Sequence, residues 1–207
     1  ENTEVAFGHK NNQELKKAYW LFKLVGKPKL VGIGKVLTNV ALAIRFPIAW
    51  IIKPTIFHQF CGGETISECA KTTKILDEFN IGTILDYSVE GKVEEGDFDV
   101  TAEEILDTVK TANNNAHIPF CVFKVTGIAR FGLLEKMNGD ETLSESEEAE
   151  KKRFLNRLTR ICAEAKKSKT PVFIDAEESW IQDTIDELAE QMMQEFNSKD
   201  AWVYNTI

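Results

Sequence analysis

Charged side chains lie within or at the end of three short apolar runs. Asp86 ends the first run, Lys124 lies within the second, and Asp175 ends the third. A charge in a buried strand is costly unless it is paired or faces a cavity. The carboxyl ends of parallel strands meet at one edge of a sheet, where α/β proteins place their chemistry. The pattern therefore predicts a binding or catalytic site at the ends of these runs.

Lys124 lies between Phe123 and Val125, so its side chain either points into a cavity or extends to solvent. Lysine is rarely buried without a partner, which favours a functional role. Two roles suit it: binding a substrate carboxylate, or forming a Schiff base. Asp175 is predicted to hydrogen-bond a cofactor or to orient Lys124. The alternative for Asp175 is an N-cap of a helix that begins near Ser179.

Two further acids, Asp86 and Glu90, have a second interpretation, because an acid between a strand and an acidic loop is often simply solvated. The segment 91–99 (GKVEEGDFD) is predicted to be such an acidic surface loop. The histidines and the four cysteines lack the spacing of a metal site, so we predict no metal. The cysteines are expected to be reduced and mostly in the core. The four tryptophans are likewise expected to pack in the core or between helices.

The elements that position these residues change character near Asn80. Amphipathic helices are predicted before it, with Asn80 ending the last in the left-handed conformation. After it, apolar runs typical of strands alternate with helical spacers long enough for parallel crossovers. The predicted helices are 14–24, 31–45, 65–79, 102–113, 144–167 and 179–197, and the predicted strands are 83–87, 120–125, 171–175 and 202–206. We therefore predict an α/β fold in which a helical segment, residues 1–80, packs on a parallel sheet formed by residues 81–207.

Composition limits the class of function. The chain has 207 residues, a net charge of −8, 43% hydrophobic and 28% charged residues, all typical of a globular protein. The acidic balance argues against nucleic acid as a partner. The polar N-terminus lacks a signal-peptide pattern, so a cytoplasmic location is expected. Residues 36–57 are strongly apolar but contain Asn39, Arg45 and Pro47. We therefore expect a buried or partner-facing helical pair there, the alternative being a membrane-surface segment.

Four segments together carry a resemblance to a known family. They are ILDYSVE at 84–90, FKVTGIARFGLLEKMN at 123–138, VFIDAEESWIQDTID at 172–186, and WVYNTI at 202–207. Their succession resembles the proline dehydrogenase family, FAD-dependent (βα)8 TIM-type barrel enzymes, and the resemblance runs from about Ile52 onward. It implies oxidation of L-proline to 1-pyrroline-5-carboxylate by hydride transfer to FAD, with electrons leaving to a quinone. Peripheral contact with the inner face of the membrane through residues 36–57 would suit a quinone acceptor.

The resemblance also implies roles for individual residues. Lys124 binds the proline carboxylate, Asp175 is the catalytic aspartate beside the flavin, Ala176 and Thr206 contact FAD, Asp86 lies near the substrate, and Glu90 pairs with an arginine that gates the site.

The chain departs from the family pattern in its extent. Four strands cannot close an eight-stranded barrel, for which about 250 residues are typical. The family's adjacent arginines on the last barrel helix have no match here. We therefore expect the N-terminal half of a barrel that is inactive without a C-terminal half. Two other functions stay open: a Schiff-base barrel lyase or aldolase that uses Lys124, and a non-catalytic helical interaction module.

Overall fold

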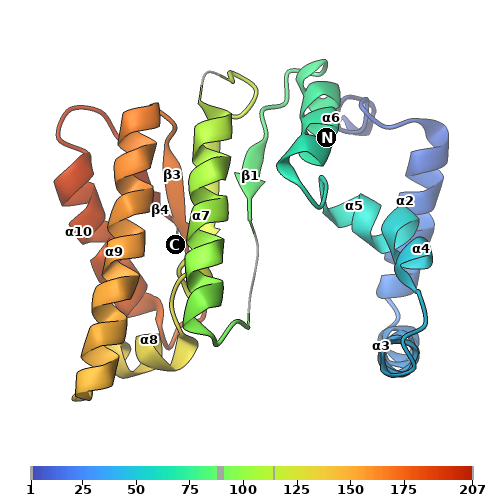
Figure 1. The fold of residues 1–207 in the computed structure, drawn as a ribbon. Helices are drawn as coiled ribbons and strands as arrows, with labels where there is room; N and C mark the ends of the chain where they lie inside the picture. Colours follow the sequence, from blue (N-terminus) through green and yellow to red (C-terminus); the bar gives the residue numbers. More distant parts are fainter. Residues whose placement is uncertain (1, 88–90, 114, 207) are drawn as a thin grey trace. The chain divides into compact units, whose positions relative to one another are not determined.

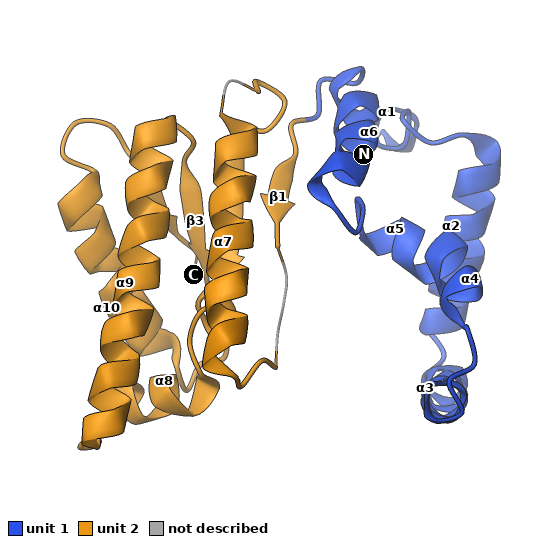
Figure 2. Ribbon diagram, viewed as in Figure 1, with its two compact units in different colours: residues 1–81 blue, residues 82–207 orange. Residues whose placement is uncertain are grey.

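A computed structural model describes residues 2–87, 91–113 and 115–206. The chain forms two compact units, residues 1–81 and 82–207 (Figure 2). The first unit is helical, and the second contains a four-stranded parallel sheet with its helices. The predicted α/β class with four parallel strands is therefore confirmed.

The helices of the first unit begin and end at the signals expected from its sequence. The side chain of Asn11 caps helix α2 (Asn12–Val25) by accepting hydrogen bonds from the backbone N–H groups of Gln13 and Glu14, at 2.9 and 3.0 Å. The Glu14 carboxylate completes the capping box on the Asn11 N–H. Asn80 has a φ of 57°, the left-handed conformation predicted for it. The helices are α1 (Thr3–Ala6), α2 (Asn12–Val25), α3 (Pro28–Ala43), α4 (Ala49–Ile52), the π-helical turn η1 (Lys53–Phe57), α5 (His58–Phe60) and α6 (Ile66–Asp77).

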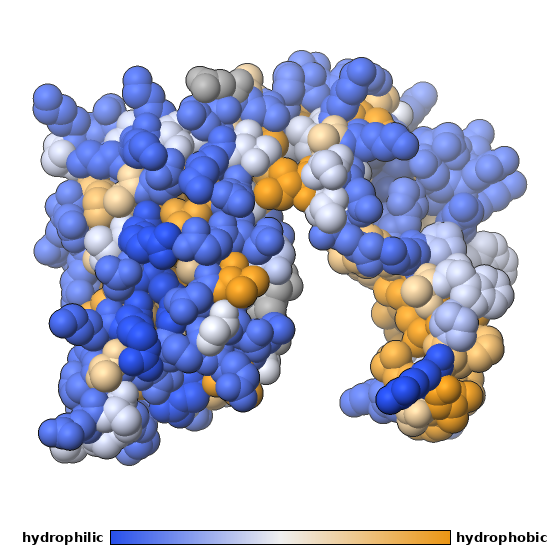
Figure 3. Space-filling view, viewed as in Figure 1, coloured by the Kyte–Doolittle hydropathy of each residue, from blue (hydrophilic) through white to orange (hydrophobic). Residues whose placement is uncertain are grey.

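Large apolar side chains of the first unit are exposed. Val36, Leu37 and Ile44 each expose more than 60% of their surface, and Thr73 is the one buried residue among the described residues 2–81. Figure 3 shows hydrophobic residues gathered on the part of this unit that contains α3. Trp20, Trp50 and Trp180 each expose more than half of their surface, so the prediction of a core position is wrong for these three tryptophans. An aromatic residue predicts burial only where the rest of its helix face is covered.

The second unit is a parallel sheet in the order β1-β2-β3-β4, built by successive βα steps of the kind that the spacers predicted. Its helices α7, α9 and α10 lie over one face of the sheet (Figure 1). The strands are β1 (Ile84–Asp86), β2 (Phe120–Lys124), β3 (Val172–Asp175) and β4 (Val203–Asn205). The helices are α7 (Glu95–Ala112), the 3-10 turn η2 (Val125–Gly127), α8 (Phe131–Asn138), α9 (Glu145–Ser168) and α10 (Gln182–Phe196).

Alternation along the strands separates two faces of the sheet. On the helix-covered face, Phe123, Val172 and Ile174 are fully buried and form the core with the helices. On the other face lie the half-buried rings of Phe120, Phe173 and Tyr204, with centroids 5.0 to 5.5 Å apart. The sheet therefore has one sealed face and one open aromatic face.

The predicted loop at 91–99 is wrong for its second half, because residues 95–99 form the first turns of α7. Phe98 is buried in the core, and the carboxylates of Glu95 and Asp99 both accept hydrogen bonds from Arg157 on α9. Acidic residues are also favourable in the first turn of a helix, where they meet the positive end of its dipole. Tertiary partners and the helix dipole thus outweigh the loop-like composition.

Buried thiols account for half of the cysteines. Cys121 and Cys162 lie in the core, and burial raises the pKa of each thiol to about 12. Cys69 is half-buried and Cys61 is exposed. The expectation of mostly core thiols therefore holds only for the two cysteines of the second unit.

Candidate functional site

The C-terminal edge of the sheet gathers the predicted site residues of β1, β2 and β3 on its open face. Lys124 and Asp175 are register partners on neighbouring strands, so their side chains leave the sheet on the same side. Asp86 pairs with Val122, two residues before Lys124, and so shares that face. The parallel register thus brings together three charged residues that are far apart in the sequence.

A hydrogen-bonded hydroxyl fixes the end of β3. The Thr206 hydroxyl donates to Oδ1 of Asp175 at 2.8 Å and accepts from the backbone N–H of Ala176 at 2.7 Å. The backbone N–H of Thr206 also donates to the carbonyl of Ile174 at 3.2 Å. Asp175, Ala176 and Thr206, which the sequence predicted separately, therefore form one connected group. The N-cap alternative for Asp175 is wrong, because α10 begins at Gln182 and no side chain caps it.

A second carboxylate joins the loops that follow β2 and β3. Oε1 of Glu177 accepts from the backbone N–H of Thr126 at 2.9 Å, and Oε2 accepts from the Thr126 hydroxyl. Burial raises the pKa of the Glu177 carboxyl, while the two bonds from Thr126 and the charge of Lys124 act in the opposite direction. Glu177 is therefore close to Lys124 and has an environment unlike that of a solvated acid.

An open cavity of about 430 Å³ lies beside the hydrogen bonds between Glu177 and Thr126. It is lined by Gly91, Lys92, Lys124, Thr126, Phe131, Glu177 and Glu178. Lys124 therefore lines a cavity, as one of its two sequence interpretations required. The cavity has two cations and two carboxylates next to the Phe131 ring, a mixture that suits a small charged organic molecule.

The sequence interpretation missed Thr126, Glu177 and Lys92 as site residues. The signal for Glu177 was present in the acidic pair that follows Asp175, but an acid after a strand is usually solvated. Thr126 gave no signal, because a threonine after a strand is common. Glu90, the predicted gate residue, lies outside the described residues.

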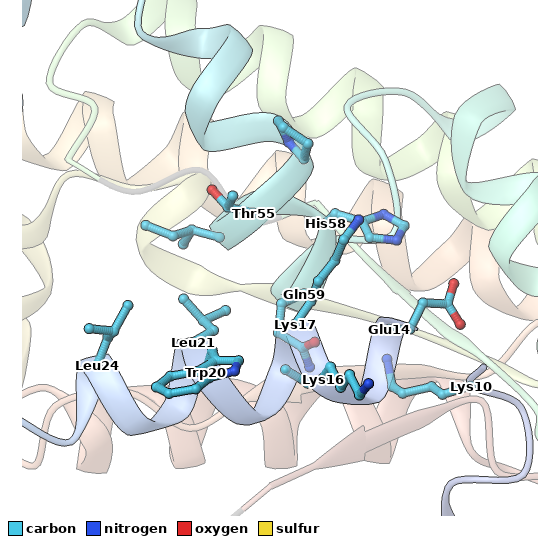
Figure 4. A pocket seen from close by; sticks show the side chains of 13 residues that line it. Lys10, Glu14, Lys16, Lys17, Trp20, Leu21, Leu24, Thr55, His58 and Gln59 are labelled. Carbon is cyan, nitrogen blue, oxygen red and sulfur yellow. The ribbon is translucent and has the colours of Figure 1, made fainter. Parts of the chain in front are cut away.

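A larger cavity, of about 640 Å³, lies in the helical unit between α2 and the η1–α5 segment. In Figure 4 the side chains of Trp20, Leu21 and Leu24 face Thr55 and its neighbours across it. Its lining is apolar at one end, and Lys10, Lys16, Lys17, Glu14 and His58 stand toward the other. None of the predicted site residues lines this cavity.

Within the described ranges, no group of three or more histidine, cysteine or acidic side chains is arranged to hold a metal ion. In the same ranges, none of the helices is both long and apolar enough to cross a membrane.

A parallel βα sheet with charged residues at its C-terminal edge is the arrangement of α/β barrel enzymes. The profile of the proline dehydrogenase family matches residues 69–207. The chain belongs to the proline dehydrogenase family.

Individual relatives agree with this assignment. The chain is 30% identical to proline dehydrogenase 1, mitochondrial, of Dictyostelium discoideum, over 80% of this chain and 35% of that protein. It is 22% identical to hydroxyproline dehydrogenase of Xenopus laevis, over 97% of this chain and 50% of that protein. The chain thus spans about a third to a half of the length of these relatives.

The fold is also that of a solved structure. The crystal structure of proline utilization A from Bdellovibrio bacteriovorus, inactivated by N-propargylglycine, matches 99% of this chain and 22% of that chain, with a TM-score of 0.59 at 14% identity. At this identity the likeness concerns the fold alone.

Proposed function

We propose that the full-length protein carrying this chain oxidises L-proline to 1-pyrroline-5-carboxylate with FAD as cofactor. The observation that carries the proposal is the register pairing of Lys124 with Asp175 on the open face of a proline dehydrogenase family sheet. This pairing sets a cation beside a carboxylate at the edge where barrel enzymes bind their substrates. An amino acid zwitterion, with one negative and one positive group, matches such a site.

Lys124 binds the substrate carboxylate in this proposal. Its ammonium lines the cavity at the sheet edge, where the half-buried setting strengthens a charge-assisted hydrogen bond relative to water. Binding the carboxylate at one point fixes the orientation of the ring, which is how a protein contributes to a reaction whose chemistry belongs to a cofactor.

Asp175 provides the carboxylate of the site in this proposal. Its Oδ1 atom accepts from Thr206, so its carboxylate is oriented before substrate binds. A fixed carboxylate beside the ring nitrogen would stabilise the positive charge that this nitrogen carries. Asp86, on the same face, adds a second negative charge near the substrate.

The residues at this edge fit a flavin in their chemistry. Phe173 and Tyr204 lie two residues before Asp175 and Thr206 on the open face, and their rings give an apolar surface that a planar ring system can cover. The Thr206 hydroxyl and the backbone of Ala176 offer hydrogen-bonding groups at its border. FAD, when bound, supplies the acceptor for the hydride that leaves C5 of proline. The role of Glu90 as a gate stays a prediction.

The test is the visible absorption spectrum of the full-length protein, recorded anaerobically before and after L-proline is added. We expect flavin bands that bleach with proline. Lys124→Ala should retain the flavin bands but need about a hundredfold more proline for half-maximal bleaching, because the half-buried charge partner of the substrate carboxylate is lost. Lys199→Ala, at an exposed lysine in a loop, is the matched control and should behave like the wild type.

Two outcomes would contradict the proposal. A full-length protein without flavin bands, or with bands that proline does not bleach, rules out proline dehydrogenase activity. If Lys124→Ala needs the same proline concentration as the wild type for half-maximal bleaching, only the proposed role of Lys124 in binding the carboxylate is contradicted.

A second substrate is favoured by one relative, which is named a hydroxyproline dehydrogenase and matches 97% of this chain. The same spectrum recorded with trans-4-hydroxy-L-proline decides between the two. Faster bleaching by the hydroxylated ring at equal concentration would assign the protein to that substrate instead.

A further inference from the structure

Both oxygens of one carboxylate are used to join two loops at the sheet edge. Glu177 follows β3, and its two oxygens accept from the backbone N–H and the hydroxyl of Thr126, in the turn after β2. Hydrogen bonds to an ionised acceptor are stronger than neutral ones, and two of them also fix orientation. We call this pair the Glu177–Thr126 bridge.

The backbone of Glu177 is held from the opposite side. Its N–H donates to Oε1 of Gln182 at 2.8 Å, and Nε2 of Gln182 donates to Oδ1 of Asp186 at 2.7 Å. The same Asp186 oxygen accepts from Nδ2 of Asn205 at 2.7 Å. Glu177 is therefore anchored to α10 and β4, so the bridge has a rigid end from which it can fix the β2 turn.

The other end of the bridge is two residues from Lys124. Thr126 lies in the η2 turn that continues directly from β2, and Lys124 is the last residue of that strand. Lys124, Thr126 and Glu177 line the same cavity. Holding Thr126 therefore fixes the end of the strand from which the Lys124 side chain extends.

We propose that Glu177 is a positioning residue that acts through Thr126 to place the Lys124 ammonium for binding the substrate carboxylate. This inference rests on the proposed function, in which Lys124 binds that carboxylate. The carboxylate of Glu177 is occupied by Thr126 and does not itself contact the substrate.

The charge of Glu177 must be separated from its hydrogen bonds in any test. Glu177→Ala and Glu177→Gln both remove the negative charge beside Lys124. Only the glutamine keeps an acceptor for the Thr126 N–H and a partner for the Thr126 hydroxyl. The difference between the two variants therefore reports the bridge alone.

The experiment measures binding by isothermal titration calorimetry with the full-length holoenzyme. The probes are cyclopentanecarboxylate and its neutral counterpart cyclopentanecarboxamide, neither of which has the ring nitrogen that is oxidised. We expect Glu177→Ala to bind the carboxylate about tenfold more weakly than Glu177→Gln, a loss within the range for removing hydrogen bonds between neutral groups. The carboxamide should differ by less than about twofold between the two variants.

Equal carboxylate dissociation constants in the two variants would overturn the inference, and so would an equal loss for both probes, which indicates a general structural role. If Glu177→Ala does not fold, Thr126→Val gives the same comparison with wild type, because it removes only the hydroxyl half of the bridge. We expect Thr126→Val to bind the carboxylate probe about threefold more weakly than the wild type. An unchanged dissociation constant would overturn the inference. Failure of the wild-type protein to prefer the carboxylate contradicts the carboxylate-binding role of Lys124, on which this inference rests. Flavin bleaching by proline tests the oxidation of proline separately, so the two failures are distinguishable.

Discussion

Glu95 is an acid whose environment favours its charged form. Hydrogen bonds from Arg153 and then Arg157, opposed by partial burial, lower the pKa of Glu95 from 4.5 to about 2. An acid with a lowered pKa in the folded state stabilises the fold above its unfolded pKa, and this contribution disappears as the pH falls through the folded value. The stabilisation by Glu95 should thus be nearly complete above about pH 5, and it should be lost progressively as the pH falls through about 2.

The corresponding measurement is the free energy of unfolding in urea for wild type and Glu95→Gln between pH 2 and pH 7. We expect the wild type to have a higher free energy of unfolding than Glu95→Gln at pH 7. This difference in free energy should become smaller below about pH 4.5. Glu94→Gln is the control, because Glu94 lies next to Glu95 but makes neither of the ion pairs with Arg153 and Arg157. A difference that stays constant with pH would contradict the assignment of the stabilisation to the ionised Glu95.

Residue type alone indicated that Lys124 and Asp175 lie at the sheet edge, since a charge in an apolar run must be paired or face a cavity. It could not indicate Glu177, because nothing in the sequence says which acid after a strand meets a donor. The partner of Glu177 is 51 residues away along the chain. The roles of all these residues stay predictions until variants are measured.

Arg157 joins two helices of the second unit and the loop between η2 and α8. Its side chain is 3% exposed and donates to Asp99 of α7 at 2.7 Å, to Glu95, and to the carbonyl of Ile128 at 3.1 Å. A buried arginine that holds several acceptors is costly to remove, because its partners lose their donors inside the protein.

We expect Arg157→Met to lower the free energy of unfolding by about 3 kcal/mol. Arg160→Met is the matched control on the same helix, since Arg160 pairs with Glu103 on the surface of α7, and it should cost about 0–1 kcal/mol. Urea denaturation at neutral pH checks both values. An equal decrease in the free energy of unfolding for both variants would mean that burying the ion pairs of Arg157 adds no stability.

The strands and the longer helices were predictable because each rests on a local pattern, whereas α8 was not among the predicted helices. Capping residues, left-handed Asn80 and apolar alternation act over a few residues, and the predicted strands match the observed ones to within one or two residues at each end. The start of α7 was not predictable, because its acidic first turn is stabilised by arginines on α9. A pattern fails where the partners come from another element.

The whole molecule has an uneven charge distribution. Residues 10–60 contain nine Lys or Arg residues and one acid, although the net charge of the chain is −8. The same region exposes many large apolar side chains, among them Trp50, Leu37 and Ile44. A basic surface with exposed apolar groups is the combination that binds anionic membrane surfaces.

We therefore propose that residues 36–57 contact a membrane peripherally, where a quinone could accept the electrons. Cosedimentation of the full-length protein with liposomes tests this. Vesicles with about 30% anionic lipid should bind it, neutral vesicles should bind it at least about tenfold more weakly, and Leu37→Glu with Trp50→Glu should abolish binding. Absence of the protein from the anionic vesicle pellet contradicts membrane contact and leaves the proposed oxidation of proline untouched.

The sequence by itself determined the class of fold, the order of the strands and longer helices, the family, and part of the set of residues from which a site could be built. These depend on local patterns and on motifs that are contiguous in the chain. Only the tertiary structure decided which residues share a face and which are joined. It paired Lys124 with Asp175 through the strand register and Asp175 with Thr206, and it added the pair of Glu177 and Thr126, which the sequence had not indicated. The physical reason is that a parallel sheet brings together strand ends that are dozens of residues apart in the chain. The sequence around one residue does not show which distant residue will hydrogen-bond to it or bury it.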